Sequence, residues 1–482
     1  MDEKAVVTDP ITPAGLAEQA VALSRSGGCV VIIKDTTEAN LRWANNVLTT
    51  NGQMHRRTAT VIAFVEVGAG ERRRSGEPGG GTAYGSVSGM VAGPDDLEPL
   101  VRAAEEAARR SGPAEDAQPL VRPDQAGTGT EFTAPAEPTS IDVFAQLAPA
   151  LGRAFAAAEA AEQLLYGFAE HIATTTWLAT STGVRLRHVQ PTGRIELNAK
   201  STDRKRSAWV GQGTRDFADV EAGSLYAEVS TRLGWAERTV ELPAGRYETL
   251  LPPSAIADLL IYALWSASAR DAEEGRSAFS SKENGTRIGE RLSPLPITVS
   301  CDPVHPEIEA SGFVVAESSS DGVESVFDNG LALRRVDWVT EGTLTNLVRT
   351  RATSHGAEVV SAPTDNLIME GLGTATLEEM IAGTERGLLL TCLWYIREVD
   401  PETLLLTGLT RDGVYLIEDG EVVGAVNNFR FNESPIDLLS RISQVGLAER
   451  TLPREWNDWF TRAVMPPVRV PDFNMSTVSQ AS

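Results

Sequence analysis

Residues 252–268, PPSAIADLLIYALWSAS, are the stretch that most restricts the folds open to this chain. Two prolines open it, Ser254 is a candidate N-cap, and almost no polar side chain follows for about three turns. Apolar residues on every side are typical of a helix that is covered all round. The stretch is shorter than the ~20 residues that a membrane span needs. We therefore predict a helix in the interior of a globular domain, with these core residues: Ile256, Leu259, Leu260, Ile261, Ala263, Leu264 and Trp265.

The chain before this helix alternates between helical and strand patterns. Apolar spacing predicts helices over residues 13–27, 94–112, 140–165 and 219–237. The third of these has Ser140 and Asp142 at its start, where capping residues are favoured. Runs rich in β-branched and aromatic residues predict strands over 29–35, 40–50, 58–67, 82–91, 171–182, 184–201 and 207–214.

Beyond residue 290, short apolar runs recur about every ten residues, a spacing typical of an antiparallel β domain or barrel. The predicted fold class is α+β. It combines an N-terminal α/β-layer domain with an antiparallel sheet and a C-terminal β-rich, barrel-like antiparallel domain. The expected division is an N-terminal α+β domain (1–112), a Pro/Gly/Ala-rich connection (113–139), a middle region of long helix and strands (140–235) and the C-terminal β-rich domain (236–482).

The charge balance limits the partners. Lys and Arg number 43 against 66 Asp and Glu, a net charge of −23 that repels phosphate backbones and anionic lipid. We expect no nucleic-acid and no membrane partner. Three widely spaced cysteines, Cys29, Cys301 and Cys392, favour a reducing compartment. Because the N-terminus also lacks the pattern of a secretory signal, we expect a cytoplasmic protein.

Residues that could perform chemistry do not form a self-sufficient catalytic motif. The five histidines form no HExxH, and CxxC, GxSxG and GxxxxGK[ST] are absent from the sequence. The tightest mixed cluster is SCDPVHPE, whose prolines favour a turn at the end of a strand over a tetrahedral zinc site. The residues of this cluster are Cys301, Asp302, His305 and Glu307.

Two further groups of polar residues favour structural roles. The acids of RDAEEGR, at residues 270–276, are expected at a helix end that enters solvent. Four more polar residues share one predicted strand, and the alternation of side chains is expected to scatter them over both faces. They are His188, Arg194, Glu196 and Lys200.

Segments along the second half of the chain resemble the TldD/PmbA (TldE) metallopeptidase family. SAFSS at residues 277–281 and RIGERL at 287–292 match a glycine-rich segment that follows the catalytic helix in this family. Five further segments follow in the family's order: GTLTNLVRTRATS, APTDNLIMEG, TLEEMIAGTERGLLLT, TGLTRDGVYLIEDGEVVGAVNNFRF and PPVRVPDFNMS. The resemblance extends over nearly the whole chain and is densest from 250 to 482.

The resemblance implies that residues 252–268 are the helix that carries HExxxH in the catalytic members, where two histidines hold zinc and a glutamate polarises water. Counting back from SAFSS, the first histidine, the glutamate and the second histidine of the motif fall near Leu260, Ile261 and Trp265. Leu264 is the alternative to Trp265 for the last of them. None of these side chains can take those roles. No cysteine follows Cys392 to match the family's late zinc ligand. The chain thus resembles the PmbA/TldE type, and we expect no catalytic, cofactor-binding or metal-binding residue in it.

The resemblance further implies a heterodimer. A TldD-like catalytic subunit would bring zinc, and this chain would close a shared chamber and help to hold an extended peptide. The expected activity is the processing or degradation of unstructured peptides. Two alternatives stay open: a stand-alone hydrolase that uses Cys301 and His305 or an unrecognised acid pair, and a peptide-binding scaffold.

Overall fold

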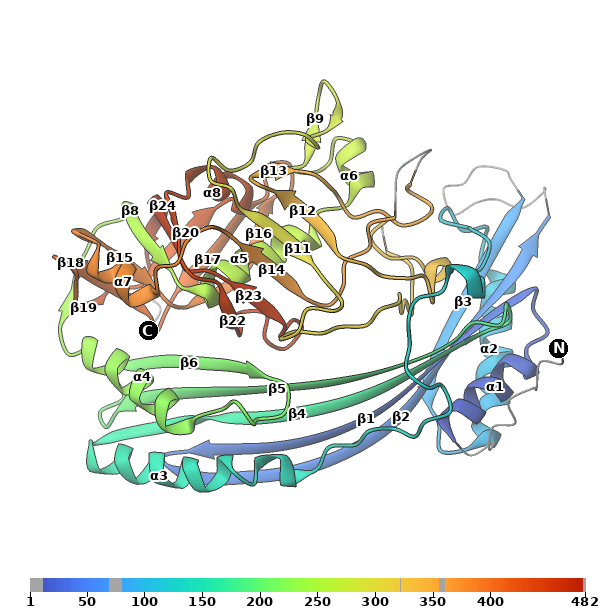
Figure 1. The fold of residues 1–482 in the computed structure, drawn as a ribbon, viewed down its shortest axis with the longest axis horizontal. Helices are drawn as coiled ribbons and strands as arrows, with labels where there is room; N and C mark the ends of the chain where they lie inside the picture. The colour runs from blue at the N-terminus through green and yellow to red at the C-terminus, as the bar shows by residue number, and fades with distance from the viewer. Residues whose placement is uncertain (1–11, 69–79, 321, 355–359, 480–482) are drawn as a thin grey trace.

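One long antiparallel sheet carries the first half of the chain (Figure 1). The computed structural model describes residues 12–68, 80–320, 322–354 and 360–479. The strand order is β3-β2-β1-β4-β5-β6, and every neighbouring pair is antiparallel. The strands are β1 (Gly28–Ala44), β2 (Val47–Val67), β3 (Gly81–Met90), β4 (Gln163–Thr180), β5 (Arg185–Ser201) and β6 (Ser207–Thr214). Segments on both sides of residues 113–139 share this sheet, and the expected domain boundaries remain predictions.

β1 and β2 form a hairpin of two long strands, where separate strands were predicted over 29–35 and 40–50. The chain stays extended through β1, turns at Asn45 and Asn46, and returns along β2. Both asparagines have left-handed φ, 51° and 61°, which a two-residue hairpin turn requires. The prediction of four strands in this part is wrong, and three are present in the described residues. The physical reason is that TTEA at 36–39 contains no turn residue and continues the strand.

Four helices cover one face of the sheet (Figure 1). They are α1 (Pro13–Leu23), α2 (Leu97–Arg110), α3 (Leu147–Ala160) and α4 (Ala222–Trp235). α1 and α2 pack around Val31, and α3 and α4 pack around Leu41 further along the same strand. Because side chains alternate between the faces of a strand, Val30 points the other way and packs with Phe327 of the C-terminal region. The sheet therefore lies between its own helices and the second half of the chain.

The helix predicted over residues 140–165 is shorter in the structure. Ser140 caps a 3-10 helix, Ile141–Phe144, by accepting a hydrogen bond from the backbone N–H of Asp142 at 3.2 Å. α3 ends at Ala160, and Glu162 adopts a left-handed φ of 55°, which breaks the helix before β4. The other predicted helices and strands up to residue 237 are present with somewhat different ends.

The C-terminal region is built on a ten-stranded and a six-stranded sheet. Neither closes into a barrel within the described residues, and three of the strand pairs there are parallel. The predicted α+β class is confirmed, whereas the barrel-like antiparallel closure was not found. The larger sheet contains β7 (Thr239–Val240), β8 (Gly245–Leu251), β15 (Arg386–Leu390), β16 (Leu393–Asp400), β17 (Leu405–Thr410), β18 (Val414–Glu418), β19 (Glu421–Val426), β20 (Phe429–Glu433), β21 (Gln444–Val445) and β24 (Val468–Val478).

The six-stranded sheet and the short helices complete this region. The sheet contains β11 (Thr298–Cys301), β12 (Val336–Thr340), β13 (Thr343–Leu344), β14 (Leu367–Glu370), β22 (Glu449–Thr451) and β23 (Ala463–Met465). β9 (Ser280–Ser281) and β10 (Gly285–Thr286) form a separate small hairpin. The helices are α5 (Pro253–Trp265), α6 (Ala269–Glu273), α7 (Leu377–Ala382) and α8 (Pro435–Arg441). None of the helices in the described ranges is long and apolar enough to cross a bilayer.

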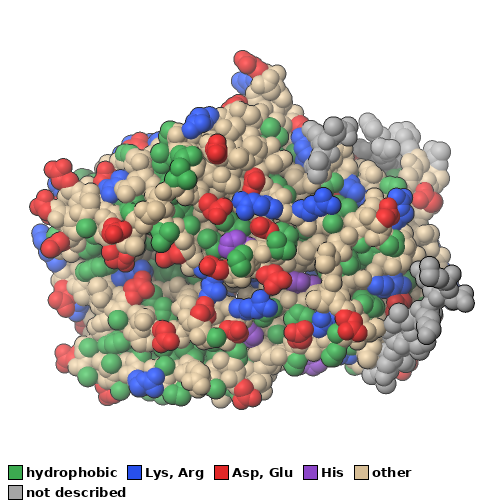
Figure 2. Space-filling model, in the orientation of Figure 1, with side chains coloured by type: hydrophobic (Ala, Val, Ile, Leu, Met, Phe, Trp, Pro, Cys, Tyr) green, Lys and Arg blue, Asp and Glu red, His purple; other side chains and the backbone are tan. Residues whose placement is uncertain are grey.

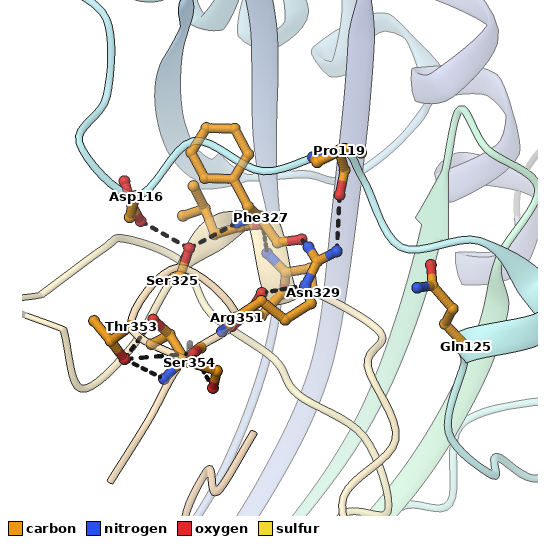
Figure 3. A network of polar contacts seen from close by, with 12 residues as sticks. Asp116, Pro119, Gln125, Ser325, Phe327, Asn329, Arg351, Thr353 and Ser354 are labelled. Carbon is orange, nitrogen blue, oxygen red and sulfur yellow. Dashed lines mark hydrogen bonds and ion pairs between the residues drawn. The ribbon is translucent and has the colours of Figure 1, made fainter. Parts of the chain in front are cut away.

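Residues 113–139 run from α2 to α3 within the first half of the chain and are fastened to the C-terminal region by a polar network (Figure 3). Asp116 accepts a hydrogen bond from the hydroxyl of Ser325 at 2.7 Å. Arg351 donates to the backbone oxygen of Pro119 at 2.9 Å and pairs with the buried Asp328 at 2.6 Å. The connection is therefore held in place by specific hydrogen bonds and a buried ion pair.

Candidate functional site

α5 occupies the position that the resemblance assigns to a catalytic helix. Pro252 is its N-cap and Pro253 its first residue, where the fixed φ of proline suits a helix start. Ser254 does not cap it, so that part of the prediction is wrong: the helix begins two residues earlier than a Ser254 cap requires. The helix belongs to the largest core cluster, which joins it to Val299 of β11 and Leu388 of β15.

The side chains at the presumed motif positions form part of this core. Leu260 is 3% exposed, and Ile261 is fully buried. Trp265 is 40% exposed, so the expectation that the helix is covered all round is wrong at its last turn. Side chains of leucine, isoleucine and tryptophan present no ligand atom that zinc accepts. The residues present therefore do not fit a zinc ion, and no group of three or more His, Cys, Asp or Glu in the described ranges could hold a metal.

Asp258 is a buried acid on α5 that sequence reasoning passed over. Its side chain is fully buried, and burial raises the pKa of this carboxyl well above its usual range. The carboxylate accepts hydrogen bonds from the backbone N–H groups of Arg454 at 3.2 Å and Glu455 at 2.9 Å. The indole of Trp456 donates to the backbone oxygen of Asp258 at 2.8 Å. The sequence did contain a signal for this residue, since a lone aspartate in an apolar helix must find hydrogen-bond partners in the interior.

Residues 453–461, PREWNDWFT, form a segment that we call the tryptophan loop. Its Glu455 is anchored on β16, where the carboxylate accepts a hydrogen bond from the N–H of Ile396 at 3.0 Å. Its Trp456 packs edge-to-face against Trp265, with ring centroids 5.1 Å apart. Burial raises the pKa of the Glu455 carboxyl, as it does for Asp258. The loop is therefore fixed between the last turn of α5 and the edge strand of the larger sheet.

The tryptophan loop also bridges to the N-terminal sheet. The guanidinium of Arg454 lies 3.7 Å from the ring centroid of Trp394 and 5.2 Å from that of Trp209 on β6. Arg194 of β5 pairs with Asp458 of the loop at 2.6 Å. Charged contacts thus join the two halves of the molecule next to the presumed motif helix.

The polar residues of β5 lie differently from the prediction. All four have even sequence numbers: His188, Arg194, Glu196 and Lys200. No register shift interrupts the pairing of β4 with β5. The four side chains therefore share one face of the sheet, and the expected division between faces is wrong. Ile195 points to the opposite face and packs with α3 and α4. At ~3.4 Å per residue, His188 and Lys200 are too far apart to act in one site.

The cluster at residues 301–307 forms a turn at the end of β11, as predicted. The N–H of His305 donates to the backbone oxygen of Asp302 at 3.2 Å, and Cys301 is completely buried. The indole of Trp338 donates to Sγ of Cys301 at 3.2 Å. Burial raises the pKa of the Cys301 thiol to about 11, so that it stays protonated near neutral pH. A buried, protonated thiol is a poor nucleophile.

The acids of residues 270–276 are all engaged in ion pairs. Asp271 pairs with Arg276 at 2.5 Å, and Glu273 pairs with Arg349 at 2.7 Å. Glu274 pairs with Arg270 at 3.0 Å. Each of these carboxylates is therefore neutralised by an arginine, and Arg276 also pairs with Glu274, so that it bridges two of them.

The arrangement was compared with known proteins. A model of the PmbA/TldA metallopeptidase C-terminal domain matches residues 244–477. Comparison with curated protein sequences found no match. Among solved structures, TldE from Thermococcus kodakarensis has a TM-score of 0.74 at 15% identity, covering 95% of this chain and 98% of that chain.

Two further solved structures share the fold. A proposed modulator of DNA gyrase from Bacteroides thetaiotaomicron has a TM-score of 0.73 at 16% identity, covering 97% of this chain and 100% of that chain. A protein from Thermotoga maritima with the same description has a TM-score of 0.71 at 15% identity, covering 95% of this chain and 99% of that chain. The sequence match over residues 244–477 and the shared fold thus confirm the resemblance of this chain to the TldD/PmbA family.

Proposed function

We propose that this chain is the non-catalytic subunit of a heterodimeric, cytoplasmic zinc peptidase that processes or degrades unstructured peptides. The observation that carries the proposal is the replacement of the presumed motif residues on α5 by core side chains. Leu260 and Ile261 are buried there, and burying them stabilises the fold without offering ligands. A TldD-like partner would contribute zinc and the base that activates water. This chain would contribute part of the chamber wall and hold the peptide in register.

The alternative of a stand-alone hydrolase has little support from the described residues. Cys301 is buried and protonated, and the acids near α6 are paired with arginines. Asp258 and Glu455 both have raised pKa values, as catalytic acids often do. Both instead accept backbone hydrogen bonds that hold the tryptophan loop. A peptide-binding scaffold without a catalytic partner is the alternative that only experiment separates.

The test is co-expression of this chain with a family member that carries HExxxH. Co-purification, zinc content and cleavage of an unstructured peptide are measured for each chain alone and for the mixture. We expect a stable complex. Zinc should be found in the partner and in the complex, and the peptide should be cleaved only when both chains are present. A partner carrying glutamine in place of the HExxxH glutamate is the matched control, because it keeps the complex but lacks the base. Chelator-resistant cleavage by this chain alone would contradict the proposal.

A further inference from the structure

A cavity of about 520 Å³ lies between the long sheet and the C-terminal region. Its floor is the sheet face opposite α1 to α4. Lys34 of β1 pairs with Thr176 of β4, which pairs with His188 of β5, so the three side chains lie in one row across the sheet. Gln190 follows on the same face, and its side chain lies 3.0 Å from Nε2 of His188. The floor therefore offers hydrogen-bond donors and acceptors.

The roof of this cavity is apolar and aromatic. It is formed by the last turn of α5, the tryptophan loop and the segment around residue 313. Trp459 is 77% exposed, which is unusual for so large an apolar side chain. The main roof residues are Leu264, Trp265, Phe313, Val314, Trp459 and Phe460.

A second cavity of about 130 Å³ adjoins the first, since Trp459 lines both. Its floor continues along β4 and β5 through Ile172, Thr192 and Arg194. Together the two cavities form what we call the seam channel, which follows β5 beneath the tryptophan loop. Figure 2 shows charged side chains of both signs and histidines gathered along this seam between the two halves.

Most charges of the seam channel are paired within the chain, and burial raises the pKa of Glu324, which also lines it. Lys34 pairs with Glu317 at 3.0 Å, and Arg194 pairs with Glu170 at 3.0 Å. Asp365 is paired with Arg462. Burial lowers the pKa of His188, so this imidazole is mainly neutral near pH 7. A phosphate would find no excess of positive charge here, and no group of three or more His, Cys, Asp or Glu in the described ranges could hold a metal ion.

A polar floor opposite an aromatic roof fits a ligand with two different sides. An extended peptide presents its backbone N–H and C=O groups to one side and alternate side chains to another. We infer that the seam channel binds an unstructured peptide in extended form, with a large apolar side chain beneath Trp265 and Trp459. This inference rests on the proposed function and specifies the peptides that this subunit holds: segments that contain an aromatic or large aliphatic residue.

The test uses the full chain alone and two fluorescently labelled peptides. Each has about ten residues of glycine, serine and asparagine, long enough to occupy an extended channel; one carries a central phenylalanine and the other alanine. Binding is followed by fluorescence anisotropy. We expect the phenylalanine peptide to bind at least about tenfold more tightly.

Two substitutions and one matched control locate the site. Trp459→Ala removes the exposed part of the roof, and Ala362→Trp fills the cavity from its rim. Each is expected to weaken binding of the phenylalanine peptide at least about tenfold. Tyr395→Ala removes an aromatic that is also exposed but lies outside the lining, and it should leave Kd unchanged. Equal binding of both peptides, or equal loss in all three variants, would overturn the inference; thermal unfolding confirms that each variant is folded.

Failure of this inference is distinguishable from failure of the proposed function. If the peptides do not bind but the mixture with an HExxxH-bearing partner cleaves them, the channel assignment is wrong and the subunit role stands. If the phenylalanine peptide binds as expected but no partner-dependent cleavage occurs, the channel stands and the subunit role is wrong.

Discussion

Oδ1 of Asp258 accepts a hydrogen bond from the backbone nitrogen of Glu455 at 2.9 Å, across 197 residues of sequence. This buried contact joins α5 to the tryptophan loop. It fixes the loop that roofs the seam channel directly onto the helix at the presumed motif position. The stability of α5 and the shape of the channel are therefore coupled through one carboxyl group.

Asp258→Asn tests this coupling. An amide can accept one of the two backbone N–H groups but turns its own donors toward the other, so we expect a loss of about 1–3 kcal/mol in the free energy of unfolding. Chemical denaturation measures it. A loss no larger than that of a surface substitution would show that the loop is held by other contacts.

The same residue predicts a pH dependence. Because the folded pKa of Asp258 is raised, the folded state binds more protons than the unfolded state between the ordinary carboxyl range near 4 and the raised pKa. Its contribution to stability is therefore fully present below about pH 4 and declines as pH rises through this window. Unfolding free energies of the wild type and Asp258→Asn, compared from pH 4 to pH 8, should show the wild-type advantage shrinking as pH increases. An advantage that grows with pH would mean that the buried carboxylate is stabilised by its hydrogen bonds.

Leu260→Ala should cost about 2–5 kcal/mol, because Leu260 is 3% exposed and the helix around it is packed between two sheets. Leu372→Ala is the matched control, since Leu372 is 85% exposed and should change stability by no more than about 0.5 kcal/mol. Both are measured by urea denaturation. Similar small effects of the two substitutions would place α5 on the surface.

The purified chain is expected to bind no stoichiometric zinc. The presumed motif positions hold Leu260, Ile261 and Trp265, and no cysteine follows Cys392. Metal analysis after incubation with zinc and gel filtration measures this, with an HExxxH-bearing family member as the positive control. One tightly held zinc per chain, lost in Cys301→Ser or His305→Ala, would instead favour a site in the 301–307 turn.

Introducing the family motif by Leu260→His, Ile261→Glu and Trp265→His should not create a peptidase. Ile261 is fully buried, so a glutamate there lacks partners and destabilises the core. A third ligand and the groups that orient ligands are also missing. We expect a lower melting temperature and no chelator-sensitive hydrolysis of an unstructured peptide. Zinc-dependent cleavage by this variant would show that α5 alone defines the catalytic subunit.

Arg351→Ala should destabilise the protein by about 3–5 kcal/mol, since it leaves Asp328 buried without its ion-pair partner. Arg122→Ala is the control, because Arg122 pairs with Asp124 in solvent and its loss should be undetectable. Removing both partners by Arg351→Met and Asp328→Asn should recover part of the loss. If the double variant is as unstable as Arg351→Ala, the network acts through the other contacts of the arginine.

The sequence alone determined the class of the fold and the nature of α5. Periodicity located most helices and strands of the first half, and the run around Leu260 was apolar on too many sides to be anything but a core helix. Local patterns carry this information because burial imposes the period of the element on its residues. The family motifs, read in order, also predicted that this helix takes the position of the family's catalytic helix.

Only the tertiary structure decided which distant residues meet. The hairpin at Asn45 and Asn46 required knowledge of two φ angles, because asparagine also occurs in other turns and in loops. The shared face of His188 and Arg194 became significant only when the tryptophan loop was found opposite it. Asp258 was hidden in an apolar pattern, since its partners lie almost two hundred residues away. Hydrogen bonds and cavities of this kind depend on long-range packing, which no local period in the sequence records.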